Sequence, residues 1–248
     1  METVTSKARQ RTTARGRLEV ERRWVIRDIG WADYEELGEL LPPPFRLAFD
    51  GSSLEIMVTG QLHDDYADAL DTFFKAVAGA LGVQFRPYRT ASWTRPELER
   101  GIQADNCYYL TTVKIKAGLI GRARKSDDAQ DYPNPDLAIE VDLSPPKIDR
   151  EGIYAALQVA ELWTFDGTDL TISRLDENGQ YRAVEKSGFL PVRASEVPRW
   201  IIEEDRSDYE AWTQRIRAWA KKTLKAREVG DRHDEANRLD VDRLGQRN

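Results

Sequence analysis

One short stretch constrains the fold of this chain most strongly, because apolar and acidic side chains alternate in it between prolines. It begins after Pro135, runs from Asp136 to Leu143, and ends before the pair Pro145-Pro146. Side chains of a strand point alternately to its two faces, and proline pairs stop a strand. The stretch therefore predicts a strand with an apolar face of Leu137, Ile139, Val141 and Leu143 and a second face that carries Asp136, Glu140 and Asp142.

The acidic face of this predicted strand has two interpretations. Glu140 and Asp142 would stand roughly 7 Å apart along the strand and could serve one site, whereas Asp136 would lie roughly 13 Å from Glu140. Neighbouring buried acids raise each other's pKa and cost stability, so they call for a cation or a basic partner. Alternatively, the acidic face of an antiparallel strand simply meets water.

The scarcity of cysteine and histidine narrows the kinds of site that the chain can build. Its 248 residues include one cysteine, Cys107, and two histidines, His63 and His233. A disulfide scaffold and a cysteine-built zinc site are therefore excluded, and we do not expect a histidine-rich metal site, because the two histidines lie far apart in the sequence. A metal would be held mainly by carboxylates, which favour Mg²⁺ or Mn²⁺. The net charge of −6 argues against coating nucleic acid through bulk electrostatics, but it leaves room for a local basic groove.

Two further acids stand out on predicted strands. Asp105 lies in a strand from Ile102 to Leu110, where alternation gives it Gln103, Cys107 and Tyr109 as neighbours on one face. Glu55 interrupts the apolar run from Leu54 to Val58 by pointing the other way. Each acid alone is typical of a surface, and their joint meaning depends on whether their strands are adjacent.

The remaining pattern predicts an α/β protein with mixed strand order. The most regular helix runs from Leu62 to Leu81 and stops at Gly82. A polar loop is expected from Gly121 to Pro133. The other expected helices are Trp31 to Leu41, Asp149 to Gln158 and Tyr209 to Leu224, and the other expected strands are Phe45 to Phe49, Leu54 to Val58, Val83 to Thr94, Glu161 to Phe165, Leu170 to Arg174 and Tyr181 to Val184.

The composition divides the chain into three parts. Residues 1–17 are basic and poor in apolar side chains, and we expect a flexible basic arm, or a plain disordered terminus. Residues 18–200 form the predicted folded body, and residues 201–248 a C-terminal helical extension with a charged tail. The extension could support a homodimer or another protein contact. No apolar segment reaches the roughly 18 residues that span a bilayer, so we expect a cytoplasmic protein without membrane contact.

Several segments together resemble the Uma family of restriction endonucleases, within the PD-(D/E)XK nuclease superfamily. The resemblance covers about Val25 to Pro198, and the order and spacing of its segments agree with the family. The segments are Trp31-Ala32-Asp33-Tyr34-Glu35, Arg46-Leu47-Ala48-Phe49-Asp50-Gly51, Leu54-Glu55-Ile56-Met57, Gly101-Ile102-Gln103-Ala104-Asp105-Asn106-Cys107-Tyr108-Tyr109, Pro135-Asp136-Leu137-Ala138-Ile139-Glu140-Val141-Asp142, and Ile153-Tyr154-Ala155-Ala156-Leu157 with Glu161-Leu162-Trp163.

The resemblance implies a restriction-endonuclease-like mixed β-sheet flanked by helices and a Mg²⁺-dependent hydrolysis of DNA phosphodiester bonds. It implies that Asp105 and Glu140 hold Mg²⁺ or Mn²⁺, with Asp142 beside them, and that Glu55 completes the acidic cluster. Related sequences often carry a histidine near His63, which would contact substrate or support the site, although an exposed histidine in a first helical turn is an equal alternative.

The chain departs from the family pattern at two positions. Gln103 stands where the family usually has an acid. The lysine of the superfamily would fall at position 142, which is an aspartate here. This family commonly carries that lysine in the next helix instead, at the position that is Arg150 here. Arginine can stabilise charge on a phosphate but cannot act as a base. Lys147 could substitute if its loop turns inward; otherwise Lys147 and Arg150 are solvated charges. The alternative to an active nuclease is a nuclease-fold protein that is weak or inactive in catalysis and binds nucleic acid or a protein.

Overall fold

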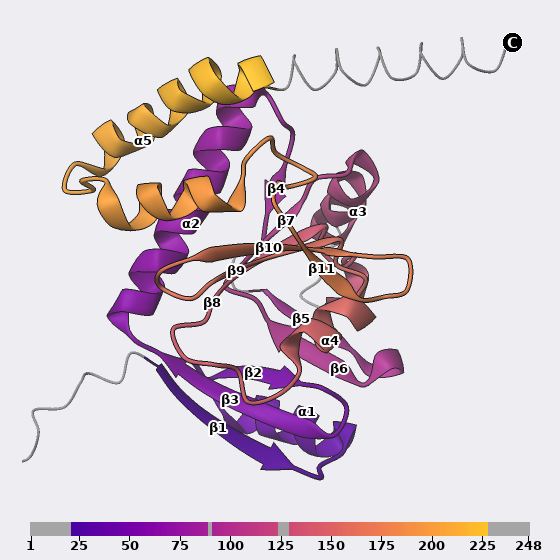
Figure 1. The fold of residues 1–248 in the computed structure, drawn as a ribbon. Helices are drawn as coiled ribbons and strands as arrows, with labels where there is room; N and C mark the ends of the chain where they lie inside the picture. The colour runs from indigo at the N-terminus through magenta and orange to yellow at the C-terminus, as the bar shows by residue number, and fades with distance from the viewer. Residues whose placement is uncertain (1–20, 89–90, 124–128, 228–248) are drawn as a thin grey trace, which may run out of the picture.

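The computed structural model describes residues 21–88, 91–123 and 129–227, and their strands form two sheets (Figure 1). The five-stranded sheet is antiparallel throughout and has the order β1-β3-β2-β6-β5. Its strands are β1 (Glu21–Arg27), β2 (Arg46–Phe49), β3 (Ser53–Thr59), β5 (Ser92–Arg95) and β6 (Arg100–Gln103). The predicted basic arm and the charged tail after residue 227 lie outside the described residues.

The six-stranded sheet has the order β11-β10-β9-β8-β7-β4 and is mixed, because β8 and β9 run parallel while its other pairs are antiparallel. The predicted α/β class with a mixed sheet is confirmed, and the structure adds the second sheet. The strands are β4 (Arg86–Pro87), β7 (Asn106–Tyr109), β8 (Leu137–Val141), β9 (Glu161–Phe165), β10 (Leu170–Leu175) and β11 (Tyr181–Val184).

The predicted strand from Ile102 to Leu110 is wrong as one continuous element. The chain leaves the five-stranded sheet after Gln103 and enters the six-stranded sheet at Asn106, so only Ala104 and Asp105 separate β6 from β7. The alternation that placed Asp105 on one face with Gln103 and Cys107 therefore does not hold. Asp105 instead lies where the chain passes from one sheet to the other.

Helices cover the outer faces of the two sheets. Tyr34 of α1 (Trp31–Leu40) packs against Phe49 and Leu54 of the five-stranded sheet. The long helix α2 (Gln61–Leu81) begins one residue before the prediction and ends at Gly82, whose φ of +75° suits glycine. Its buried face packs on the apolar face of β8, and this face of β8 is the one predicted from the sequence: Leu137, Ile139 and Val141.

The predicted C-terminal helix forms as α5 (Tyr209–Trp219), followed by a π-helical turn from Ala220 to Leu224. Trp212, Ile216 and Leu224 are fully buried in the same core as α2, and α5 lies along α2 in Figure 1. This extension is therefore part of the main core. A helix that the sequence did not predict, α3 (Thr112–Ala123), precedes the expected loop and includes its first three residues, and residues 124–128 of that loop lie outside the described residues.

A second core lies between the two sheets. It combines Ala48 and Ile102 of the five-stranded sheet with Ala138 of β8, and with Ile153 and Tyr154 of α4 (Arg150–Ala156). The helix is shorter than its predicted range of Asp149 to Gln158. Because β8 buries one face against α2 and the other in this second core, its acids do not lie on a solvent-facing sheet surface. The structure thus excludes the interpretation in which they simply meet water.

Candidate active site

Charged side chains from the two sheets meet beside the second core, which lies between these sheets. Strand alternation gives β1, β2 and β3 an inner face that carries Ala48 of this core together with charged residues. Arg23 of β1 crosses to the other sheet and donates to Asp142 at 2.6 Å. The charged residues that the five-stranded sheet contributes are Glu21, Arg23, Arg46 and Glu55.

Asp105 and Glu140 lie opposite one another across β7 and β8. The antiparallel register pairs Asn106 with Ile139, so the next position outward sets Asp105 against Glu140. The backbone N–H of Val141 also donates to Asp105 Oδ2 at 2.8 Å. Both acids are 2% exposed. The two residues expected to hold a metal are therefore brought together at the junction of the sheets.

Glu140 is held by two donors from α4. Arg150 Nη2 donates to Glu140 Oε2 at 2.6 Å, and the hydroxyl of Tyr154 donates to Oε1. Burial raises the pKa of Glu140 and the negative charge of Asp142 adds to this, while Arg150 opposes it. Burial and Glu140 likewise raise the pKa of Tyr154 well above its ordinary value, so this phenol remains a donor.

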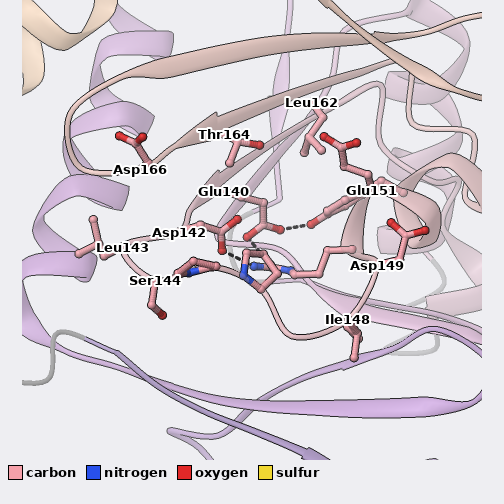
Figure 2. Close-up of a pocket in the computed structure, with 14 residues that line it drawn as sticks. Glu140, Asp142, Leu143, Ser144, Ile148, Asp149, Glu151, Leu162, Thr164 and Asp166 are labelled. Carbon is pink, nitrogen blue, oxygen red and sulfur yellow. Dashed lines mark hydrogen bonds and ion pairs between the residues drawn. The ribbon is translucent and has the colours of Figure 1, made fainter.

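Arg150 forms ion pairs with both Glu140 and Asp142, and these two acids line a cavity (Figure 2). The Nη1 of Arg150 donates to Asp142 Oδ1 at 2.6 Å. Burial alone would lower the pKa of Arg150, but Glu140 and Asp142 raise it above its ordinary value. At 7% exposed, Arg150 is not the solvated charge that was one of its predicted alternatives. It is a permanent cation fixed between two carboxylates.

Glu55 connects the site to the segment before α4. Arg23 Nη1 donates to Glu55 Oε1 at 2.7 Å, and the backbone N–H of Lys147 donates to Oε2 at 2.6 Å. Lys147 itself is exposed. The predicted substitute lysine therefore contacts the acidic cluster through its backbone, while Glu55 lies in the cluster as the resemblance implied.

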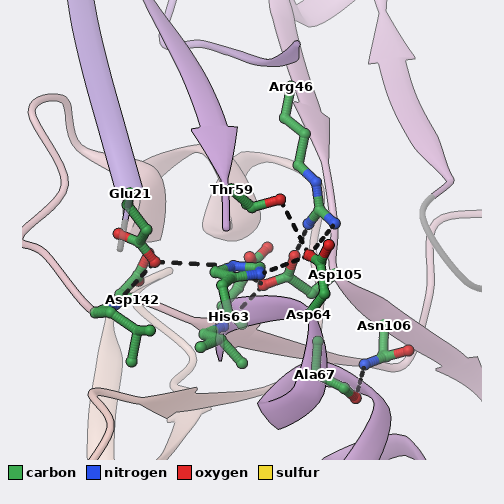
Figure 3. Close-up of polar contacts among 12 residues, drawn as sticks. Glu21, Arg46, Thr59, His63, Asp64, Ala67, Asp105, Asn106 and Asp142 are labelled. Carbon is green, nitrogen blue, oxygen red and sulfur yellow. Dashed lines mark hydrogen bonds and ion pairs between the residues drawn. The ribbon is translucent and has the colours of Figure 1, made fainter. Parts of the chain in front are cut away.

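His63 occupies a buried polar cluster with Asp105, Arg46 and Glu21 (Figure 3). Its Nε2 lies 3.3 Å from Asp105 Oδ2, and its Nδ1 lies 3.3 Å from Asp64 Oδ1. Burial lowers the pKa of His63, and the nearby charge of Arg46 lowers it further, so the imidazole is neutral near pH 7. The expectation of an exposed histidine is wrong, because the first turn of α2 faces inward at this point.

The cluster carries an excess of negative charge. Five buried or half-buried carboxylates meet three guanidinium groups, which leaves two formal negative charges when His63 is neutral. The carboxylates are Glu21, Glu55, Asp105, Glu140 and Asp142, and the guanidinium groups are Arg23, Arg46 and Arg150. A charge of minus two and hard oxygen donors suit a divalent cation. Within residues 21–88, 91–123 and 129–227, however, no three potential ligands are already grouped for a metal.

An open cavity of about 590 Å³ gives access to this site. Glu140, Asp142 and Arg150 line it, and so do Thr164 and Asp166 at the end of β9 (Figure 2). The cavity therefore lies at the carboxyl ends of the parallel strands β8 and β9, which is where α/β proteins commonly bind ligands. The cavity therefore opens onto Glu140, Asp142 and Arg150, whereas Asp105 does not line it.

The two other positions singled out in the sequence have different surroundings. Asp136 accepts hydrogen bonds from the backbone N–H groups of Leu110 and Thr111, at 2.7 and 2.8 Å, and it pairs with Lys114. It fixes the start of α3 and does not join the cluster. Gln103 borders a small gap that Arg46, Glu55 and Arg150 also line, so its neutral amide lies beside the site.

Sequence reasoning missed three charged members of the site: Glu21, Arg23 and Arg46. Glu21 accepts from the backbone N–H groups of Leu143 and Ser144, at 2.9 and 3.0 Å, and so fixes the chain just after β8. The sequence carried only a weak signal for these residues. Glu21 and Arg23 are two positions apart, which is the spacing of side chains on one face of a strand. Their charged surroundings resemble a solvated terminus more than a strand.

The fold and the site define an α/β protein with a buried cluster of carboxylates and arginines beside an open cavity at the ends of β8 and β9. The model of the Uma2 family, described as "Putative restriction endonuclease", matches residues 31–203. The chain therefore belongs to this family. None of the helices in the described part of the chain has the length and apolar composition needed to cross a membrane.

One similar solved structure is a crystal structure from Anabaena variabilis ATCC 29413, described as "a putative nuclease belonging to DUF820". It shares 14% sequence identity with this chain, and the match covers 75% of this chain and 99% of that one, with a TM-score of 0.41. Comparison with curated proteins gave no match.

Proposed function

We propose that this protein is a Mg²⁺-dependent endonuclease that hydrolyses phosphodiester bonds of DNA. The observation that carries the proposal is the hydrogen bond that fixes Asp105 to the backbone N–H of Val141, next to Glu140, in a chain that belongs to a restriction endonuclease family. These two acids would hold Mg²⁺ or Mn²⁺, with Asp142 beside them. The metal would supply an activated water and neutralise charge on the phosphate.

The protein's own groups would position the acids and compensate charge. Tyr154 and Arg150 fix the two oxygens of Glu140, and the backbone of Val141 fixes one oxygen of Asp105. Arg150 lines the cavity, so it is placed to meet an anionic group that enters. Since arginine does not release its proton, Arg150 would stabilise charge and would not act as a base.

The test is cleavage of supercoiled plasmid DNA by the full chain in Mg²⁺, in Mn²⁺ and with a chelator. We expect nicking that requires the metal and is lost in Asp105→Asn and Glu140→Gln. Glu177→Gln, at an exposed position in the turn between β10 and β11, is the matched control and should cleave like the parent. Cleavage that persists in both site variants would refute the assignment.

A second candidate function is binding without catalysis. It is favoured by one observation: guanidinium groups already neutralise the central acids, Arg46 at Asp105 and Arg150 at Glu140. Such a protein would bind nucleic acid or a protein partner and would leave the plasmid intact. A gel-shift assay with a DNA duplex in chelator, run beside the cleavage assay, separates the two functions. Retention of DNA without metal-dependent cleavage supports this second candidate.

A further inference from the structure

Arg46 is placed between two carboxylates that differ in burial. It is the first residue of β2, and its Nη1 forms an ion pair with Oδ1 of the buried Asp105. Its Nη2 lies 3.8 Å from Asp64 Oδ1, and the Asp64 side chain is 60% exposed. In Figure 3 the guanidinium faces both acids, which lie next to each other. One arginine therefore has a partner inside the site and another at the surface within reach.

Asp105 needs a positive partner in the absence of metal. A buried carboxylate that is left unpaired destabilises the folded protein strongly. Val141 donates only a neutral hydrogen bond to it. Among the described contacts of Asp105, Arg46 is the one group that always carries positive charge. A divalent cation at Asp105 would balance the charge of this carboxylate in place of Arg46, and it would repel the guanidinium of Arg46.

We propose that Arg46 is a positioning residue that competes with the divalent cation for Asp105. Without the cation it pairs with Asp105 and balances the charge of the carboxylate inside the protein. When the cation binds, the guanidinium moves to Asp64. This inference rests on the proposed function, because it requires a cation at Asp105, and it adds an internal competitor that sets how tightly the cation binds.

The competition gives two substitutions opposite effects on metal affinity. Arg46→Gln removes the competitor, so Mn²⁺ should bind more tightly, by roughly tenfold. Asp64→Asn removes the surface partner that accepts the displaced guanidinium, so Mn²⁺ should bind more weakly. Arg46→Lys keeps a competing cation and should stay close to the parent affinity. A residue with only a structural role would not produce these opposite signs.

The measurement is calorimetric titration of the full chain with Mn²⁺ alone, without DNA. Asp65→Asn is the matched control, because it removes the same charge one residue away from Asp64 but from a side chain that pairs with Arg206. It should leave the affinity within about twofold of the parent, since exposed charges are screened by salt. Thermal unfolding is the second readout: Mn²⁺ should raise the Tm of Arg46→Gln more than that of the parent.

The outcomes separate this inference from the proposed function. If the parent binds Mn²⁺ in a Glu140-dependent way but Arg46→Gln binds no more tightly, the inference fails and the proposed metal site remains. If neither the parent nor Arg46→Gln binds Mn²⁺, both fail. If Arg46→Gln does not fold, Asp64→Asn decides alone at its exposed position, and an affinity equal to that of Asp65→Asn overturns the inference. Equal tightening in Arg46→Lys and Arg46→Gln also overturns it.

Discussion

Asp105 accepts a hydrogen bond of 2.8 Å from the backbone N–H of Val141, the residue that follows Glu140. This bond joins the segment between the two sheets to the strand with the most strongly patterned sequence of the chain. It fixes one acid beside the other without using a further side chain. The relative position of Asp105 and Glu140 is therefore built into the backbone of the fold.

Removing the shared guanidinium of Arg150 should destabilise the protein. In Arg150→Met, Glu140 loses a donor while remaining buried, and Asp142 keeps only Arg23 of its two guanidinium partners. Breaking a buried ion pair on one side costs about 3–5 kcal/mol, and we expect a loss of this size in the free energy of unfolding. Urea denaturation monitored by tryptophan fluorescence measures it.

The control for Arg150 is an exposed ion pair. Arg182 of β11 pairs at 3.1 Å with Asp176 in the turn before this strand, and the Arg182 side chain is 65% exposed. Arg182→Met should change the free energy of unfolding by less than about 1 kcal/mol. Equal losses in the two variants would show that the buried position of Arg150 has no special energetic role.

Cys107 should make the stability depend on alkaline pH. Burial raises the pKa of its thiol to about 12, whereas an unfolded chain has an ordinary thiol pKa near 9. The native state thus favours the neutral thiol. The stabilisation that the neutral thiol gives to the folded state is complete below pH 9 and is lost as the pH rises towards 12. The slope is at most about 1.4 kcal/mol per pH unit.

The comparison for Cys107 is Cys107→Ala, which should lose stability less steeply between pH 9 and pH 10.5 in urea denaturation. Labelling gives an independent check: at pH 8, the native parent should react with a thiol reagent far more slowly than the same chain in urea. Rapid labelling of the native protein would contradict the burial on which the prediction rests.

The C-terminal helix should be required for the fold. Trp212 is fully buried and its indole N–H donates to the backbone carbonyl of Trp200 at 3.1 Å. We expect Trp212→Ala to cost about 3–5 kcal/mol in the free energy of unfolding. Truncation after Glu204 should prevent cooperative unfolding, because α2 would lose the helix that covers it.

The strands and helices with regular patterns could be predicted from the sequence. The acidic strand around Glu140 has the predicted faces, and β9 and β11 have the predicted boundaries. The break at Ala104 could not be predicted, because neither glycine nor proline marks it and the polar pattern continues through it. What separates β6 from β7 is that each finds its partners in a different sheet, which is a tertiary property.

Four acids of the site and one of its arginines could be predicted, whereas Glu21, Arg23 and Arg46 could not. Glu140 lies in a strand with a clear pattern, and Asp105 lies in a segment that resembles the family. Arg23 lies within β1 and Arg46 begins β2, and an arginine in a strand ordinarily faces water. Their burial follows from the inner faces of β1 and β2 meeting the end of β8. Composition also could not show that part of the negative charge is gathered at one cavity, beside three buried guanidinium groups.

The most direct test of the central claim is calorimetric titration with Mn²⁺ of the parent, Asp105→Asn, Glu140→Gln and the exposed control Glu177→Gln. If Asp105 and Glu140 hold the catalytic cation, the parent and Glu177→Gln should bind Mn²⁺ with the same affinity, and both site variants should lose the binding. Equal binding by all four proteins, or no binding by the parent, would contradict the account.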